Sequence, residues 1–534
     1  MFTHKVLDLW EQLWLRMADE SVTYPLLGSI SSHSHEEEPK ETLVADLEPH
    51  RISIQAAASK RRSFPYRWLQ MMKLFLPSFL HTFAAEAEPS ERRSTAWLDG
   101  LRGVAALFVV MHHMSLLWFS WDIHNGWTNW NDHLIQLPII RLVVSGRANV
   151  MIFFVISGYA LSLKPLSLIR KDQHSKMYQA LASSIFRRHP RLFIPAIVIC
   201  SPAPVIAYLG GYSGEGVPGA AIKPMRPPRF DNIWRQFGHY IQTIMTLSDV
   251  YTPNGDIAWV YSDSLWTLPI EFRSSLVVFT MLLALSRCTT RARVVITSCI
   301  AFYSFWYFRW GELLFVGGML VVESTLRSHR STINSWYVPG ADETSIGFKV
   351  RRNKSLWSTP MENQTLRRLG CIVAFLTTLF ILSMPEQGRG AANSFGFKTL
   401  VELIPTRFHE AGAADYFWKP IAAIFLVLVI NNSQFLQSIF TTGLAQYLGR
   451  ISFALYLVHM LILHSLGYWL GGYFLQITGS GSYWQYGTGI GLAIVTVGCI
   501  IIWAADLGSR FVDAKVVRFT AWAYAKLCQN TFQK

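Results

Sequence analysis

The stretch WLDGLRGVAALFVVMHHMSLLWF, residues 97–119, decides the fold, because it is long and apolar enough to cross a membrane as a helix. It nevertheless carries Arg102 and, eleven residues later, His113. An α-helix makes about three turns over eleven residues, so both side chains lie on one stripe, about 16 Å apart along the axis. Ionisable groups inside a span are costly, which makes them functional candidates. The alternative is an arginine that reaches the membrane surface and a histidine that bonds a neighbouring helix.

The composition of the chain is that of an integral membrane protein. Of its 534 residues, 51% are hydrophobic and only 15% are charged, whereas soluble domains carry about 25% charged residues. The apolar segments predict an all-α fold, a polytopic membrane bundle of about ten transmembrane helices. These segments are residues 101–120, 148–163, 192–209, 265–286, 294–309, 311–324, 369–384, 417–431, 452–472 and 486–505.

The positive charges predict the orientation of the bundle. With ten spans and a cytosolic N-terminus, the basic segments 164–191, 287–293, 325–368 and 510–534 all fall on the cytosolic side, as the positive-inside rule requires. Both termini are then cytosolic, and the endoplasmic reticulum and the plasma membrane both remain open. The net charge of +14 reflects this topology and an attraction to anionic membrane lipids. Because the basic residues are spread over loops, nucleic acid is not an expected partner.

The chain is predicted to have three regions. Within the N-terminal region, residues 29–63 are polar and are predicted to be disordered. Residues 66–85 are predicted to form an interfacial helix, and an extra span is the alternative. The regions are residues 1–96, a cytosolic N-terminal region that begins with an amphipathic helix; 97–505, the membrane domain; and 506–534, a cytosolic tail.

A cluster of arginines lies at the predicted cytosolic start of the third span, in IFRRHPRLFIP, residues 185–195. Arg188 and Arg191 are three residues apart and face the same way on a helix. Guanidinium groups at a helix start suit phosphate groups, and Arg187 adds a third positive charge. The alternative is a topology signal that any membrane protein carries at this place.

The segment LWTLPIEFRSSLVVF, residues 265–279, places Glu271 in an apolar stretch. Pro269 removes one backbone hydrogen bond, which predicts a broken helix that lines a cavity. Glu271 could then pair with an arginine or position a substrate hydroxyl. The alternative is that the span begins after Arg273 and leaves Glu271 in water.

Other polar and small residues are assigned to packing. Gly158 and Gly318 allow close approach of helices. His459 lies 180° around its helix from Arg450, so it reads as a packed polar group. The six cysteines match neither a disulfide framework nor zinc-ligand spacing, so no metal is predicted.

Taken in their order along the chain, these segments resemble the membrane-bound acyltransferase 3 family. Their residue sequences are most similar to the fungal branch of that family. The resemblance covers residues 97–505 and rests on LDGLRGVAALFVVMHH, FFVISGY, FRRHPRLFIP, LWTLPIEFR and LGRISFALYLVHM. It implies transfer of an acyl group from a coenzyme A thioester to a hydroxyl. Many bacterial members have two acidic residues in tandem where this chain has Glu271 followed by Phe272, so a mechanism that needs a carboxylate pair does not carry over.

The resemblance also implies roles for the candidate residues. The family's Arg-x10-His falls on Arg102 and His113, and its Arg-x2-Arg falls on Arg188 and Arg191. His113 is the expected general base, although His112 beside it also competes for this role. Arg102 or Glu271 would orient the groups. The arginines Arg187, Arg188 and Arg191 would hold the phosphates of acyl-CoA, with acetyl-CoA as the first choice of donor.

The acceptor is less defined by the sequence. An aromatic-rich bundle suits a hydroxyl-bearing small molecule that partitions into the membrane, such as a polyketide or terpenoid secondary metabolite, and a glycan is the alternative. A multi-span transporter of an anionic or acylated small molecule is the competing function, because buried Arg, His and Glu also line translocation paths. A scaffold without chemistry is a third. Consumption of acyl-CoA separates the enzyme from both.

Overall fold

The computed structural model describes residues 76–78, 94–128, 132–251, 260–334 and 361–528. The chain divides into two units, residues 1–66 and 67–534, and all described residues belong to the second. The predicted amphipathic helix, the polar stretch 29–63 and most of residues 66–85 lie outside the described part.

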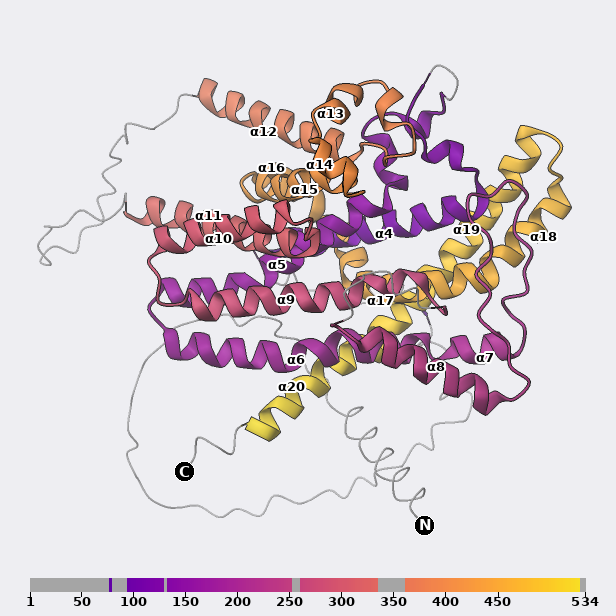
Figure 1. Ribbon diagram of the computed structural model, residues 1–534, viewed down its shortest axis with the longest axis horizontal. Helices are drawn as coiled ribbons and strands as arrows, with labels where there is room; N and C mark the ends of the chain where they lie inside the picture. The colour runs from indigo at the N-terminus through magenta and orange to yellow at the C-terminus, as the bar shows by residue number, and fades with distance from the viewer. Residues whose placement is uncertain (1–75, 79–93, 129–131, 252–259, 335–360, 529–534) are drawn as a thin grey trace, which may run out of the picture. The chain divides into compact units, whose positions relative to one another are not determined.

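The described part of the chain is helical and contains no strand (Figure 1). Short 3-10 turns precede or join several helices, and two π turns, Leu463–Gly467 and Ser509–Asp513, interrupt the last long ones. The α-helices are α4 (Ala96–Trp118), α5 (Gly146–Arg170), α6 (His174–Cys200), α7 (Pro202–Tyr208), α8 (Ile233–Ser248), α9 (Thr267–Ala284), α10 (Thr290–Trp306), α11 (Trp310–Asn334), α12 (Met361–Leu382), α13 (Lys398–Glu402), α14 (Thr406–Glu410), α15 (Asp415–Asn431), α16 (Gln434–Phe440), α17 (Gly443–Ile462), α18 (Tyr468–Thr478), α19 (Tyr483–Gly508) and α20 (Ala514–Cys528).

The predicted class, a polytopic membrane helix bundle, is confirmed, but the count of ten spans is not. Each predicted span overlaps a helix. In the described part of the chain, seven helices are long and apolar enough to cross a membrane, or eight if the pair α15–α16, bent by 105°, counts as one span. The helices α10 and α11 fall outside this set; α10 has only 17 residues, and α11 carries Glu312 and Glu323.

The charge on α11 is neutralised inside the bundle. Glu323 is 1% exposed. Its carboxylate accepts a hydrogen bond of 2.6 Å from Arg170 at the end of α5 and another from Arg293 of α10. A carboxylate is tolerated in such a place only when its partners are held in good geometry.

Replacing Glu323 with glutamine should therefore destabilise the bundle, because two arginines then lose their shared carboxylate. Removing one member of a buried ion pair costs about 3–5 kcal/mol. The check is thermal unfolding of the purified protein in detergent, with Glu312→Gln on the same helix as the matched control. Equal melting temperatures for the two variants would contradict the structural role of Glu323.

Two helix pairs approach closely at glycines. A Cβ added at Gly103 of α4 would overlap the backbone nitrogen of Gly449 in α17, and one added at Gly158 of α5 would overlap the carbonyl of Phe315 in α11. The packing predicted for Gly158 and Gly318 is present, since a Cβ at Gly318 would in turn overlap the backbone of α5. These contacts set α4 against α17 and α5 against α11.

The start of α9 differs from both sequence interpretations. A 3-10 turn, Asp263–Trp266, leads directly into α9 at Thr267. Pro269 lies in the first helical turn, where the missing amide hydrogen removes no intrahelical bond. The helix therefore starts near Pro269 and is not broken there, and Glu271 belongs to its second turn. The predicted break at Pro269 is therefore wrong, and so is the alternative in which the span begins after Arg273.

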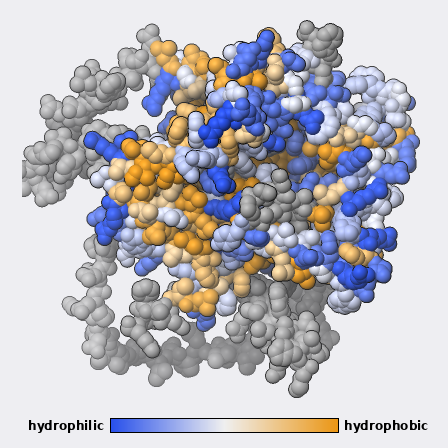
Figure 2. Space-filling model, viewed as in Figure 1, coloured by the Kyte–Doolittle hydropathy of each residue, from blue (hydrophilic) through white to orange (hydrophobic). Residues whose placement is uncertain are grey.

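The outer surface of the bundle suits lipid. Figure 2 shows broad apolar patches on the viewed face. Large apolar side chains of α10 and α12 point outward, among them Val295, Phe302 and Leu369. In Figure 1, α6, α9 and α11 run side by side, and each neighbouring pair is in contact.

Candidate active site

A cavity of about 220 Å³ lies where α4 ends and α5 begins. Helices α4, α5 and α15 contribute to it, together with the segments 119–145 and 383–414 that follow α4 and α12. His112 and His113 both line this cavity, so the family histidine and its neighbour both reach an internal space. The principal polar side chains of the lining are His112, His113, His124, Arg141, Glu386 and Tyr456.

The two neighbouring histidines differ in how they are held. The Nδ1 atom of His112 lies 2.6 Å from the carbonyl oxygen of Val144, so in the neutral ring it donates and leaves Nε2 as an acceptor. The Nδ1 atom of His113 is buried and has no hydrogen-bond partner among the described residues. The His113 ring instead contacts the ring of His459, at 5.2 Å between centroids. His459 is fully buried, so it packs directly behind the candidate base.

A buried arginine closes one wall of the cavity. Arg141 is 4% exposed, and its two terminal nitrogens donate to the carbonyl oxygens of Ser383 and His124, each at 2.8 Å. Burial, aided by His112 and by the charges of nearby arginines, lowers the pKa of His124 to about 3. Burial also lowers the pKa of Arg141 to about 10, with Glu386 opposing it. At neutral pH Arg141 is therefore charged and His124 is neutral.

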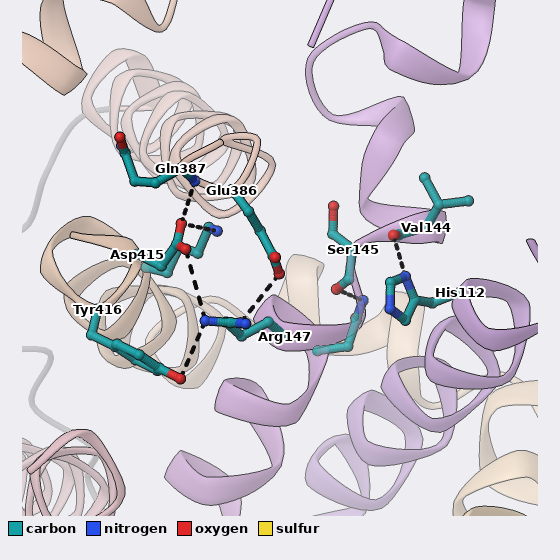
Figure 3. A network of polar contacts seen from close by, with 10 residues as sticks. His112, Val144, Ser145, Arg147, Glu386, Gln387, Asp415 and Tyr416 are labelled. Carbon is teal, nitrogen blue, oxygen red and sulfur yellow. Dashed lines mark hydrogen bonds and ion pairs between the residues drawn. The ribbon is translucent and has the colours of Figure 1, made fainter. Parts of the chain in front are cut away.

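An ion network contributes another part of the cavity lining (Figure 3). Arg147, at the start of α5, lies 3.2 Å from a carboxylate oxygen of Glu386 and 3.7 Å from one of Asp415, and donates to the Tyr416 hydroxyl at 3.2 Å. Lys419, 2% exposed, lies 3.3 Å from Asp415. Burial raises the pKa of Glu386, but the charges of Lys419 and Arg147 outweigh it and leave that pKa below its usual value. The network ties α5, α15 and the segment after α12 together.

The predicted arginines lie toward the other end of α4. Arg102 donates to the carbonyl of Gly449 at 3.1 Å and pairs with Asp99 at 3.3 Å. Arg191 of α6 is exposed and lies within electrostatic reach of Arg102 and of Asp513, which follows α19. Arg187 and Arg188 act on Arg191 as well. The structure thus gathers Arg102 and the Arg-x2-Arg pair at one place, with Asp513 as a partner that sequence patterns did not indicate.

Glu271 belongs to the arginine group and not to the histidine cavity. Its carboxylate accepts from Arg188 at 2.8 Å and from the Ser157 hydroxyl at 3.3 Å, so it does pair with an arginine. It also acts electrostatically on Tyr456, which lines the cavity. Tyr456 hydrogen-bonds Thr267, one turn before Glu271, at 2.6 Å. Glu271 is therefore bonded to the arginine group and acts on one residue of the cavity lining.

The site thus consists of two groups along α4. Neither the four arginines of the group nor Glu271 line the cavity of His113. Helix geometry separates Arg102 from His113 by about 16 Å along the axis of α4. Sequence reasoning missed Arg141, Arg147 and Glu386, which lie beyond span ends, where no periodicity marks them. The sequence offers only a weak indication of these three residues, which is that each is a charged residue just outside an apolar segment. In the described part of the chain, no group of three His, Cys, Asp or Glu is arranged to hold a metal ion.

A membrane-spanning helix bundle with a histidine cavity at one end of α4, and with arginines of α4 and α6 gathered toward the other end, defines a polytopic membrane protein with a polar site. Sequence comparison supplies the family. The sequence model of one protein family, the acyltransferase domain called acyltransferase 3, matches residues 95–504 of this chain. The chain belongs to the membrane-bound acyltransferase 3 family, and it is an integral-membrane O-acyltransferase.

Curated relatives agree with this assignment. The chain is 36% identical to O-acetyltransferase PaAT-1 of Phomopsis amygdali, over 90% of this chain and 94% of that protein. It is 23% identical to acyltransferase clz18 of Cochliobolus lunatus, over 80% and 95% of the two chains. Acyltransferase R4 of a Phoma species is also 23% identical, over 80% and 94%. No solved structure matches the chain.

Proposed function

We propose that this membrane O-acyltransferase moves an acetyl or short acyl group from acyl-CoA to a hydroxyl of a small molecule, such as a polyketide or terpenoid. The observation that carries the proposal is the position of His113, which lines a cavity and lies on the helix that also carries Arg102. The name of the relative PaAT-1 supports acetyl as the transferred group. A glycan acceptor is the second candidate.

The arginine group is suited to the donor. Arg188 and Arg191 lie with Arg187 and Arg102 in one group of four arginines. Three carboxylates accompany them, because Glu271 pairs with Arg188, Asp99 pairs with Arg102 and Asp513 acts on Arg191. Guanidinium forks bind phosphate oxygens in pairs. In the proposal these groups hold the phosphates of coenzyme A, and the pantetheine arm runs past Glu271 and Tyr456 toward the cavity. Glu271 orients Arg188 through their ion pair.

The histidine cavity is suited to the transfer step. His113 takes the proton of the acceptor hydroxyl as the hydroxyl oxygen attacks the thioester carbonyl carbon. The carbon–sulfur bond then breaks, and the departing thiolate takes the proton from the imidazolium. The products are the ester and free coenzyme A. An acyl-histidine intermediate is the alternative route to the same products.

Release of free thiol tests the proposal directly. Membranes that contain the protein are incubated with acetyl-CoA and a metabolite extract of the organism that carries the chain, and the thiol and the acetylated product are measured. We expect thiol release that requires the extract, with an equal amount of ester by mass spectrometry. Uptake of a solute without thiol release would favour the transporter instead. Longer acyl-CoA donors in parallel assays define the acyl group.

A further inference from the structure

The cavity around His113 carries more positive than negative charge. Arg141, Arg147, Arg389 and Lys419 line it, and Glu386 is the carboxylate of the lining in the described part of the chain. Asp415 pairs with Arg147 and Lys419. Arg147, Lys419, Glu386 and Asp415 thus balance one another. Four positive charges are thus accompanied by two negative ones, and neither Arg141 nor Arg389 has an ion-pair partner among the described residues.

Arg141 is the more deeply buried of the two. Its hydrogen bonds go to the carbonyl oxygens of Ser383 and His124, which bear no formal charge. No carboxylate among the described residues lies within ion-pair distance of it, and its Nε atom is buried without a partner. A buried cation without a counter-ion is costly and is usually paired or used.

Arg389 approaches the cavity from the segment after α12. Its guanidinium carbon lies 3.4 Å from the centroid of the Trp121 ring, which is a cation–π contact, and no ion pair joins Arg389 to a carboxylate of the described residues. Arg389 and Arg141 come from different covering segments, 383–414 and 119–145, and both line the same cavity.

The groups near Arg141 do not supply a free negative charge, since the neighbouring histidines are neutral or positive. His124 is neutral at neutral pH because its pKa lies at about 3, and its ring nitrogen Nε2 is 3.2 Å from the Ser115 hydroxyl. His112 is bonded to the Val144 carbonyl. Glu386 is the nearest carboxylate to act on Arg141, but its oxygen is committed to Arg147. A ligand is therefore the remaining source of a negative charge.

We propose that the cavity binds an acidic group of the acceptor, a carboxylate or a phosphate, between Arg141 and Arg389. The acceptor is then a hydroxy acid or a hydroxyl-bearing phosphate, and its hydroxyl lies at His113. This inference rests on the proposed function, since it assigns the cavity to the acceptor. The phosphates of the donor are assigned to the arginine group at the other end of α4, about 16 Å along the helix.

The test modifies the acceptor pool, because the acceptor is not identified. The metabolite extract is split into an untreated part, a part whose carboxyl groups are methylated, and a part treated with phosphatase. We expect one of the two treatments to remove most of the extract-dependent thiol release from acetyl-CoA. Full activity after both treatments would overturn the inference and leave the enzyme itself intact. No release even with the untreated extract would overturn the proposed function and this inference with it.

Variants show whether Arg141 and Arg389 bind that group. Arg389→Gln should raise the KM for the acidic acceptor about 10- to 100-fold, the usual worth of a hydrogen-bonded charge, and leave the KM for acetyl-CoA unchanged. Arg141→Gln should do the same, but Arg141 also ties two segments together, so Arg389→Gln is the decisive variant. Arg407→Gln is the matched control, because Arg407 stacks on Trp306 outside the cavity. An unchanged acceptor KM in Arg389→Gln would contradict the assignment.

Discussion

Replacing His113 with alanine is expected to lower the rate of acyl transfer by about 10²–10⁴-fold, the usual contribution of a general base. The loss should fall on kcat, because the arginine group that is proposed to hold the donor is separate from the cavity. Thiol release from acetyl-CoA, with the acetylated product measured in parallel, checks the rate. Binding of acyl-CoA to the purified variant should stay near the wild-type value.

The neighbouring histidine provides the sharpest comparison. His112 is held by the Val144 carbonyl and lines the same cavity, so His112→Ala should lower the rate less, by loosening the wall next to the base. His409→Ala, an exposed histidine on α14, should have no effect. If His112→Ala abolishes transfer and His113→Ala does not, the base is His112, and the family spacing has been assigned to the wrong histidine.

Replacing Arg188 with alanine should weaken the binding of acyl-CoA by about 100-fold. The variant loses a guanidinium that is proposed to bind phosphate, and it leaves the half-buried carboxylate of Glu271 without its 2.8 Å partner. Removing one member of a hydrogen-bonded charge pair between a protein and its ligand, here Arg188 and a donor phosphate, commonly costs about 2–5 kcal/mol or more. That cost corresponds to about 30-fold and upward in affinity. Equilibrium binding of acetyl-CoA to the purified protein provides the measurement.

Two further variants separate charge from geometry at Arg188. Arg188→Lys retains the charge but loses the fork, so it should bind the donor with intermediate affinity. Arg287→Ala, an exposed arginine after α9, controls for the general loss of one positive charge. Equal donor affinity in wild type and Arg188→Ala would place the donor phosphates elsewhere.

The parts of this protein that the sequence could predict are those with helical periodicity or a strong composition signal. The stripe from Arg102 to His113 follows from helix geometry, and an ion pair for Glu271 follows from the cost of burying a carboxylate alone. The count of spans did not follow. The sequence counted α10 and α11 as spans, whereas by length and apolar composition neither is among the helices of the described part that could cross a membrane.

The walls of the cavity were also beyond sequence reasoning. Arg141 and Glu386 lie in the segments 119–145 and 383–414, whose described residues form short 3-10 turns and short helices without a repeating apolar pattern. Residues from these two segments meet only in the folded protein, where Arg141 donates to the carbonyl of Ser383. No spacing within one segment could indicate a contact between residues 242 positions apart.

The buried carboxylate of Glu323 also bears on how the chain enters the membrane during synthesis. Its two partners, Arg170 and Arg293, precede it in the chain. Both arginines have therefore been made when α11 leaves the ribosome, and the carboxylate can meet them as it leaves water. A chain in which α11 came first would have to expose that charge to lipid, which is costly. The order of the helices along the sequence thus suits insertion from the N-terminus onward.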